Sequence, residues 1–246
     1  MKVGLFIPCF IDQFYPEVGK ATYELLVKLG CDVDYPSGQT CCGQPMANGG
    51  HAHDSKGLAI KFGDVFSPYD YIVGPSGSCV NHVREHYDIV PQTENIKKVR
   101  KGTWEITDFL VNVLKVDNLK ASFPKKVGVH NSCHGHRGLG LGVQTELNDP
   151  TQVSVIETLL NQVEGIKLAE LDHPDECCGF GGTFSVTEPT VSVQMGINRV
   201  ADHKKQDVEV ITGADMSCLM HIQGILKRQG SDVEVKHVVE ILNSEL

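Results

Sequence analysis

Apolar and amphipathic stretches alternate in a regular order along the first half of the chain. Apolar, β-prone segments at residues 2–7, 33–35 and 71–74 predict three short strands. Helical spacing of apolar residues predicts a helix over residues 17–29, which ends at Gly30. Three more helices are predicted at residues 56–66, from residue 79 to 86, and at 104–114 with Thr103 as its N-cap.

The second half repeats this order of elements. Strands are predicted at residues 127–131, 166–171 and 208–212, and helices at 151–163, 191–206, 217–228 and 238–242. The last helix mirrors residues 106–110 of the first half. Because strands alternate with helices, the pattern predicts parallel sheets flanked by helices. We therefore expect an α/β protein with two pseudo-symmetric parallel-sheet domains from an internal duplication, residues 1–119 and 120–246.

Composition narrows the class of protein without changing this picture. The 246 residues are 41 % hydrophobic and carry a formal net charge of −9, and the basic residues form no long block, so nucleic-acid binding is not expected. No apolar run is long enough to cross a bilayer, and no signal peptide opens the sequence. Both observations predict a cytoplasmic protein that is not integral to a membrane. Thiols stay reduced there, so abundant cysteines indicate metal or redox chemistry.

Nine cysteines occur in the chain, and eight of them form one pattern that occurs twice. In each half a cysteine follows the first strand, an adjacent pair precedes a glycine, and a fourth cysteine follows a later strand. The two sets are Cys9, Cys41, Cys42 and Cys79, and Cys133, Cys177, Cys178 and Cys218. The ninth, Cys31, has no counterpart in the second half, which favours a structural role for it.

The positions of the eight cysteines indicate a metal-binding function. Each comes just after a predicted strand or at the start of the following helix, so the four cysteines of each half should converge at one edge of their sheet. Thiolates are natural ligands of iron–sulfur clusters and of zinc. Two adjacent thiolates suit a multi-iron cluster, and the chain lacks the short C-x-x-C pairs of ordinary zinc sites. We predict all eight as cofactor and metal ligands, with His82 and His221 as further candidates.

The cysteine motifs resemble the cysteine-rich CCG domain, which occurs twice in the heterodisulfide-reductase B subunit and in electron-transfer subunits of glycolate and glycerol-3-phosphate dehydrogenases. Over its whole length the chain is similar to the LutA/LldE/YkgE lactate-utilisation proteins. The matching stretches are residues 8–16, 41–45 (CCGQP), 75–79 (PSGSC), 177–184 (CCGFGGTF) and 218–220 (CLM).

The resemblance implies an iron–sulfur electron-transfer subunit of an NAD-independent L-lactate dehydrogenase complex. Such a complex oxidises L-lactate to pyruvate, and its other members are a ferredoxin-like iron–sulfur subunit and a third subunit. The chain alone is not expected to be active. Each half has four cysteines where the heterodisulfide-reductase type uses five. A four-thiolate [4Fe–4S] cluster, or one with histidine as the extra ligand, is therefore as compatible as a noncubane cluster, with one or two clusters per chain.

Other functions are also compatible with the sequence. The chain could be a heterodisulfide-reductase-like thiol/disulfide redox subunit, or a zinc-holding scaffold subunit without catalytic activity. The loop at residues 134–140, HGHRGLG, occurs only in the second half. It could hold a small anion through Arg137, or it could be a flexible surface loop.

Overall fold

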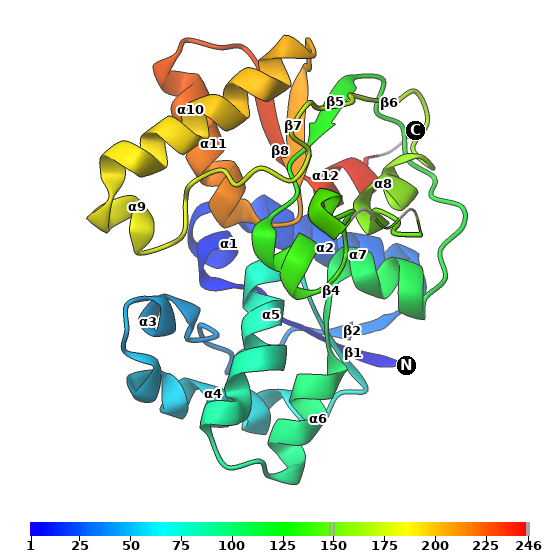
Figure 1. Cartoon of the computed structure of the whole chain (residues 1–246). Coiled ribbons are helices and arrows are strands. Elements are labelled where there is room, and N and C mark those ends of the chain that lie inside the picture. Colours follow the sequence, from blue (N-terminus) through cyan, green and yellow to red (C-terminus); the bar gives the residue numbers. More distant parts are fainter. Residues whose placement is uncertain (148, 150, 245–246) are drawn as a thin grey trace.

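Two parallel sheets organise the computed structural model, which describes residues 1–147, 149 and 151–244 (Figure 1). The first sheet has the strand order β2-β1-β3-β4, and all neighbouring strands run parallel. In chain order, the first half comprises β1 (Lys2–Leu5), α1 (Cys9–Phe14), α2 (Pro16–Lys28), β2 (Asp32–Asp34), α3 (Gln44–Asn48), α4 (Lys56–Phe66), β3 (Tyr71–Gly74), α5 (Gly77–His86), α6 (Glu94–Gly102), β4 (Thr103–Glu105) and α7 (Ile106–Asp108), which continues as a π-helical segment, Phe109–Val113.

The second sheet repeats this topology with the strand order β6-β5-β7-β8, again parallel throughout. The second half comprises β5 (Lys126–Val129), a π-helical segment (His134–Gly138), α8 (Val155–Leu160), β6 (Lys167–Leu168), α9 (Phe184–Thr187), α10 (Pro189–Lys205), β7 (Val210–Gly213), α11 (Met216–Arg228), β8 (Glu234–His237) and α12 (Val238–Leu242). The predicted fold class, two α/β units on parallel sheets, is confirmed. Among the described residues, no helix combines the length and apolar character that crossing a membrane requires.

The structure departs from the prediction at two of the four edge strands, β4 and β8, and it adds the short helices α1, α3 and α9. The predicted helix at residues 104–114 with Thr103 as its cap is wrong at its start, because residues 103–105 pair with β3 as β4. The helix begins at Ile106, and the carboxylate of Glu105 caps it by accepting the N–H of Thr107 at 2.8 Å. The equivalent edge strand β8 was not predicted, and the helix predicted over residues 151–163 is confined to α8.

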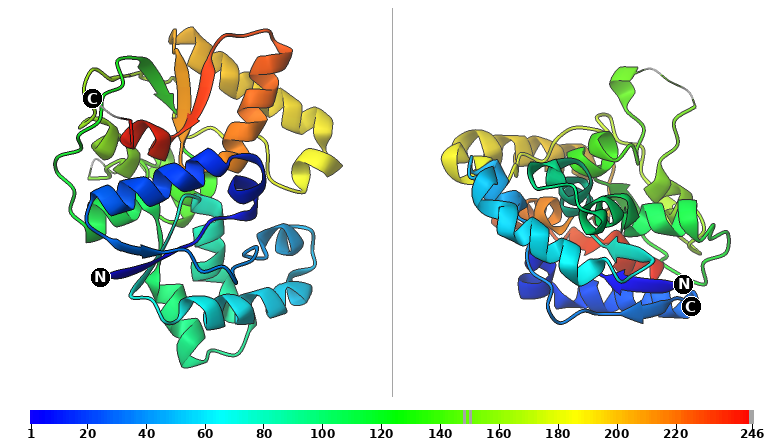
Figure 2. Two further views of the ribbon diagram at one scale, coloured as in Figure 1. Left: turned by 180° about the vertical axis from the view of Figure 1, so that it is seen from behind. Right: turned by 90° about the horizontal axis from the view of Figure 1, so that it is seen from below.

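One hydrophobic core joins the two halves. Helix α2 of the first half packs against α12 of the second, and α7 packs against α8. Figure 2 shows α2 running between the two sheets beside α12. Leu26 of α2 and Ile241 of α12 are both fully buried in this core. A smaller core, which includes Phe62 and Phe66, lies on the other face of the first sheet. The two halves therefore share part of their packing.

Glu105 should make the stability of the protein depend on pH. Its side chain is fully buried, and desolvation raises the pKa of its carboxyl from 4.5 to about 8. Between these pH values the folded protein keeps a proton that the unfolded chain releases. The free energy of unfolding should therefore fall as the pH rises from about 4.5 to about 8. Glutamine keeps an acceptor oxygen but cannot ionise, so Glu105→Gln should flatten this slope, which amounts to at most about 1.4 kcal/mol per pH unit.

Urea unfolding across this pH range measures the effect of the substitution. Glu94→Gln is the control, because the side chain of Glu94 is 90 % exposed. In Glu94→Gln the free energy of unfolding should fall with pH as steeply as in the wild-type protein. An equally steep slope in Glu105→Gln would show that another group causes the pH dependence.

Candidate functional site

The strand order explains where the cysteines lie. In each sheet the first strand sits between the second and the third, so successive connections leave it in opposite directions. Ligand sites of open parallel sheets form outside the carboxyl ends of the strands, at this point of reversal. Cys9 and Cys79 follow β1 and β3, and Cys133 and Cys218 follow β5 and β7. The adjacent cysteine pairs come from the loops that follow β2 and β6.

The four thiols of the first half, here called the first quartet, form a chain of contacts. The Sγ atoms of Cys9 and Cys41 lie 3.7 Å apart, and interactions with the thiols of Cys41 and Cys79 raise the pKa of Cys42. The backbone N–H of Gly43 donates to Cys41 Sγ at 3.4 Å. Gly43 has a φ of 93°, which glycine adopts without strain, and this conformation allows its amide to face the sulfur.

The thiols of the second half, the second quartet, repeat this arrangement. Interactions with the thiol of Cys177 raise the pKa of Cys133 and of Cys178, and the Sγ atoms of Cys178 and Cys218 lie within 4.8 Å of each other. The N–H of Gly179, whose φ is 87°, donates to Cys177 Sγ at 3.4 Å. The duplication thus preserves both the thiol contacts and the amide donor, and the four cysteines of each half converge as predicted.

Thiol–thiol interactions lower the pKa of one cysteine in each quartet. Thiol hydrogen bonds from Cys42 and then Cys9 lower the pKa of Cys41. In the second quartet, the thiols of Cys133 and Cys178 do the same for Cys177. The thiolate is the form of cysteine that binds metals. In each quartet, the cysteine whose pKa is lowered is the first of the adjacent pair.

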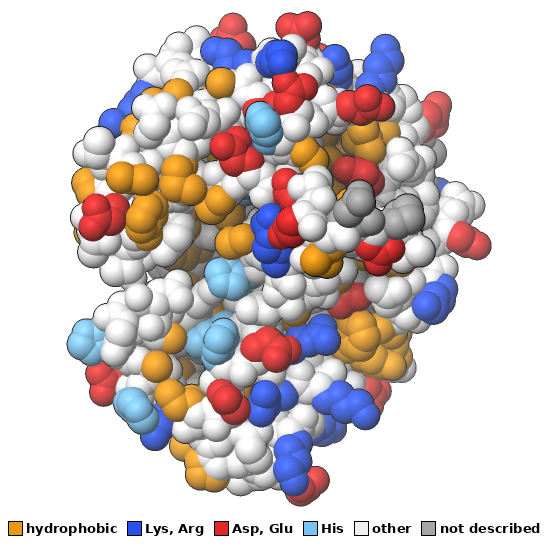
Figure 3. All heavy atoms as spheres, in the orientation of Figure 1, with side chains coloured by type: hydrophobic (Ala, Val, Ile, Leu, Met, Phe, Trp, Pro, Cys, Tyr) orange, Lys and Arg blue, Asp and Glu red, His pale blue; other side chains and the backbone are white. Residues whose placement is uncertain are grey.

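Both quartets open on a single cavity of about 510 Å³ between the two halves. Seven of the eight repeated cysteines line it, and the eighth, Cys41, contacts Cys9. Residues of α3 and α9 line the cavity as well, and Figure 3 shows the surface hollowed on that side, where the two halves meet. Across the cavity the ring of Phe10 meets that of Phe180 edge to face, with centroids 6.0 Å apart. The sequence predicted a site in each half, and the structure makes the two sites neighbours.

Asp215 connects the two quartets. Its Oδ2 accepts the N–H of Ser78 at 2.8 Å, and its Oδ1 accepts the N–H of Ser217 at 3.2 Å. Ser78 directly precedes Cys79, and Ser217 directly precedes Cys218. A single buried carboxylate thus holds the segment that carries the last cysteine of each quartet.

The structure brings to the second quartet a histidine that the sequence analysis did not single out. A ring nitrogen of His130 lies within 4.8 Å of the Sγ atoms of Cys178 and Cys218. The ring is buried, and neither of its nitrogens has a hydrogen-bond partner among the described residues. Burial lowers the pKa of His130 to about 3, so the ring is neutral at physiological pH. The sequence feature that could have identified His130 is its position three residues before Cys133, where the first half has Phe6.

The two histidines that the sequence did single out lie in different surroundings. Nε2 of His221 is 3.2 Å from the carbonyl oxygen of Ser192. His82 is buried near the first quartet, where desolvation lowers its pKa to about 4 and the charge of Cys41 acts in the opposite direction. The assignment of both as ligands stays a prediction.

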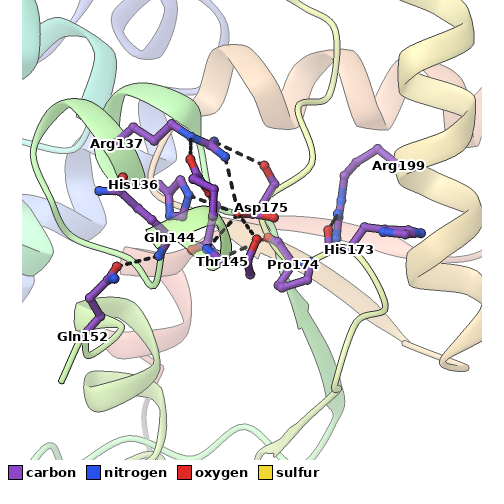
Figure 4. Close-up of polar contacts among 11 residues, drawn as sticks. His136, Arg137, Gln144, Thr145, Gln152, His173, Pro174, Asp175 and Arg199 are labelled. Atoms are coloured by element: carbon purple, nitrogen blue, oxygen red, sulfur yellow. Dashed lines mark hydrogen bonds and ion pairs between the residues drawn. The ribbon is translucent and has the colours of Figure 1, made fainter. Parts of the chain in front are cut away.

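Arg137 is not available to an anion. Its Nε donates to Glu146 at 2.6 Å, and its Nη2 donates to Asp175 at 3.3 Å. Figure 4 shows the guanidinium beside Asp175, to which the hydroxyl of Thr145 also donates at 2.7 Å. The two carboxylates neutralise the cation and fasten its loop to the segment just before Cys177. The loop is therefore tied down and carries no free positive charge.

Cys31, the cysteine without a counterpart, is buried in the core shared by the two halves and does not line the cavity. Desolvation by this burial raises the pKa of its thiol. A neutral, buried thiol behaves as a small apolar side chain. These surroundings support the structural role predicted for Cys31.

Comparison with known proteins identifies the repeated unit. Residues 3–84 and 127–223 each match the family described as the cysteine-rich CCG domain. Lactate utilization protein A from Bacillus subtilis (strain 168) is 43 % identical over 248 residues, which cover 99 % of this chain and 100 % of that protein. The protein of the same name from Halalkalibacterium halodurans is 42 % identical over 249 residues, covering 100 % and 98 %.

Solved structures resemble the chain only loosely. A putative Asp/Glu racemase from Yersinia pestis aligns over 98 % of this chain and 95 % of its own, with 13 % identity and a TM-score of 0.37. A hypothetical protein from Helicobacter pylori reaches a TM-score of 0.45 at 11 % identity, over 98 % of this chain and 48 % of its own. Likeness at this level says nothing about the function of the chain.

Proposed function

Because the chain belongs to the cysteine-rich CCG domain family, and within it groups with lactate utilization protein A, we propose that it is the iron–sulfur electron-transfer subunit of a complex that oxidises L-lactate to pyruvate. The observation that carries the proposal is the meeting of two four-thiol sites on one cavity. The proposed partners are a ferredoxin-like iron–sulfur subunit and a third subunit. The proposed compartment is the cytoplasm, where thiols stay reduced.

The donor set of each quartet fits an iron–sulfur cluster. We propose the eight repeated cysteines as the ligands of one or two clusters, of the [4Fe–4S] type. Such a cluster, held by cysteine thiolates, would accept or donate one electron at a time. The amides of Gly43 and Gly179 already point at sulfur, and N–H donors of this kind are a means by which proteins tune cluster potentials. The ring nitrogens of His130 have no hydrogen-bond partner among the described residues, so the ring can offer an N–H to a cluster on the second quartet.

The pairing of two sites also suits the proposed reaction. Oxidation of lactate to pyruvate releases two electrons and two protons. Two neighbouring one-electron centres can accept the electrons in succession and pass them to a partner. The shared cavity makes the two sites neighbours, which shortens the path between them.

Metal analysis tests this proposal directly. Protein purified without oxygen should be brown, contain iron and acid-labile sulfide, and give an EPR signal when reduced. A colourless protein with stoichiometric zinc would contradict the proposal and support a scaffold role. The contact between Cys9 and Cys41 would also allow a disulfide. An iron-free protein that reversibly forms such a bond would support the heterodisulfide-reductase-like alternative.

The isolated chain should not oxidise lactate at a useful rate. Its sequence has no G-x-G-x-x-G dinucleotide-binding motif and no other evident hydride acceptor, so another subunit must supply part of the route. Dye reduction with L-lactate, measured for the chain alone and after addition of its partner subunits, checks this expectation. D-lactate serves as the control substrate. Rapid L-lactate-dependent dye reduction by the chain alone would contradict the proposed division of labour.

A further inference from the structure

The two halves can be superposed residue by residue behind their cysteine pairs. A Cβ on Gly4 of β1 would lie 3.2 Å from the ring of Phe66, and a Cβ on Gly128 of β5 would lie 2.3 Å from the ring of His203. Phe66 and His203 therefore occupy equivalent places against the central strand. One helical turn earlier stand Phe62 in the first half and Arg199 in the second.

A second pair of glycine contacts supports the same alignment of the two halves. A Cβ on Gly43 would meet Ser55 at 2.9 Å, and a Cβ on Gly179 would meet the carbonyl oxygen of Ser192 at 2.6 Å. Ser55 precedes Phe62 by the same number of residues as Ser192 precedes Arg199. In the strands, Phe6 and His130 both lie three residues before the first cysteine of their quartets.

The three equivalent positions differ completely in chemistry. In the first half they form an aromatic cluster, in which the ring of Phe6 lies 5.1 Å from Phe62 and 5.8 Å from Phe66, between centroids. This cluster packs in the same small core as Cys42. In the second half the positions hold His130, Arg199 and His203, here called the polar triad.

The polar triad is buried as deeply as the phenylalanines. Arg199 and His203 are fully buried, and Arg199 Nε donates to His203 Nε2 at 3.1 Å. Asp202 pairs with Arg199 Nη1 at 3.3 Å, whereas Nη2 has no hydrogen-bond partner within the described part of the chain. His130, 2 % exposed, is the member that reaches the sulfurs of Cys178 and Cys218.

This difference gives the two quartets unequal power to hold negative charge. Reduction adds an electron to a cluster, and N–H donors near its sulfurs stabilise the added charge. Apolar surroundings without donors disfavour that charge. The carboxylate of Asp202 offsets the positive charge of Arg199. Asp215 contacts segments of both halves, so its negative charge does not distinguish the two quartets.

The first quartet has a buried histidine of its own, His82, on which the charge of Cys41 acts. Among the described residues, however, only the second quartet has a histidine nitrogen within 4.8 Å of two of its sulfurs, that of His130, where the first half has Phe6.

We propose, resting on the iron–sulfur function above, that His130 makes the second quartet the site of higher reduction potential. Cys9, Cys41, Cys42 and Cys79 would hold the cluster of lower potential, and Cys133, Cys177, Cys178 and Cys218 that of higher potential. Transfer of one electron from the first to the second would then be favourable. No bond is made or broken. Lactate oxidation supplies the electron, and the partner subunit removes it from the second quartet. His130, whose ring nitrogens have no partner among the described residues, would act by donating an N–H to a cluster held on the second quartet.

Anaerobic redox titration followed by EPR tests the proposal on the full-length protein. The wild type should show two couples. His130→Phe installs the residue of the first half and should lower only the upper couple. We expect at least a tenfold change in its ratio of oxidised to reduced cluster, equivalent to about 59 mV for one electron. His130→Gln retains a side-chain N–H and should keep most of the wild-type potential. His51→Phe, a control at a histidine that is 71 % exposed and does not line the cavity, should move neither couple.

A spectroscopic measurement needs no variant. In wild-type protein labelled with ¹⁵N-histidine, the signal of the higher-potential cluster should show magnetic coupling to an imidazole nitrogen, and the other cluster should show none from His130. If the two couples coincide, or if His130→Phe shifts the lower one, the proposal is wrong. If the ¹⁵N coupling is absent from the wild-type protein, the proposal is wrong, even where the His130→Phe variant does not bind its second cluster and cannot be titrated. Wild-type protein without iron would instead remove the proposed function itself.

Discussion

Cys178→Ala should remove roughly half of the bound iron and the cluster absorbance of the second half, while the first half keeps its own. Cys178 is 1 % exposed, lines the cavity, and lies within 4.8 Å of both Cys218 Sγ and a His130 nitrogen. Alanine deletes a thiolate at the centre of this set, and the neutral ring of His130 does not supply the lost negative charge. Cys42→Ala should have the same effect on the first half. Iron and sulfide analysis with visible absorption measures both.

Cys31→Ala is the matched control for these two variants. Cys31 is a buried cysteine too, but it packs in the shared core and does not line the cavity. The Cys31→Ala variant should keep the full iron content of the wild type. Loss of all the iron from Cys178→Ala would show that one cluster spans both quartets. Equal loss from Cys31→Ala would show that the ligand assignment is wrong.

Leu26→Ala should lower the free energy of unfolding by ~2–5 kcal/mol, the usual range for a buried leucine. Leu26 lies on α2, which packs against α12 of the other half, and its side chain is fully buried in the core that includes residues of both. The cavity left by the leucine therefore weakens contacts of both halves together. Fluorescence of Trp104, the single tryptophan, follows the first half, and hydrogen exchange in β5 and β7 follows the second.

Both probes should report the same loss if the halves unfold as one unit. Val27→Ala, next along the same helix, is the control, because Val27 is 45 % exposed. It should change stability little. A loss confined to Trp104, with exchange in β5 and β7 unchanged, would show that the halves fold independently in spite of their common core.

Local pattern predicted the elements that are long or strongly apolar. The strand at residues 71–74 and the helices at 56–66 and 238–242 have the bounds that were predicted. The edge strands β4 and β8 escaped prediction, because each has three or four residues and includes charged ones such as Glu105 and Glu234. Such segments have little strand preference of their own and become strands by pairing with a central neighbour.

The sequence by itself determined the chemistry of this protein and its duplication. Eight thiols in two matched sets, each placed after predicted strands, were enough to predict two thiol-rich sites at sheet edges, because side-chain type and strand order are written locally along the chain. Only the tertiary structure decided that both sites open on one cavity and that α2 and α12 share a core. It also placed His130 beside Cys178 and Cys218. These features depend on how two sheets pack together, which is set by contacts between residues far apart in sequence and leaves no periodic signal within either half.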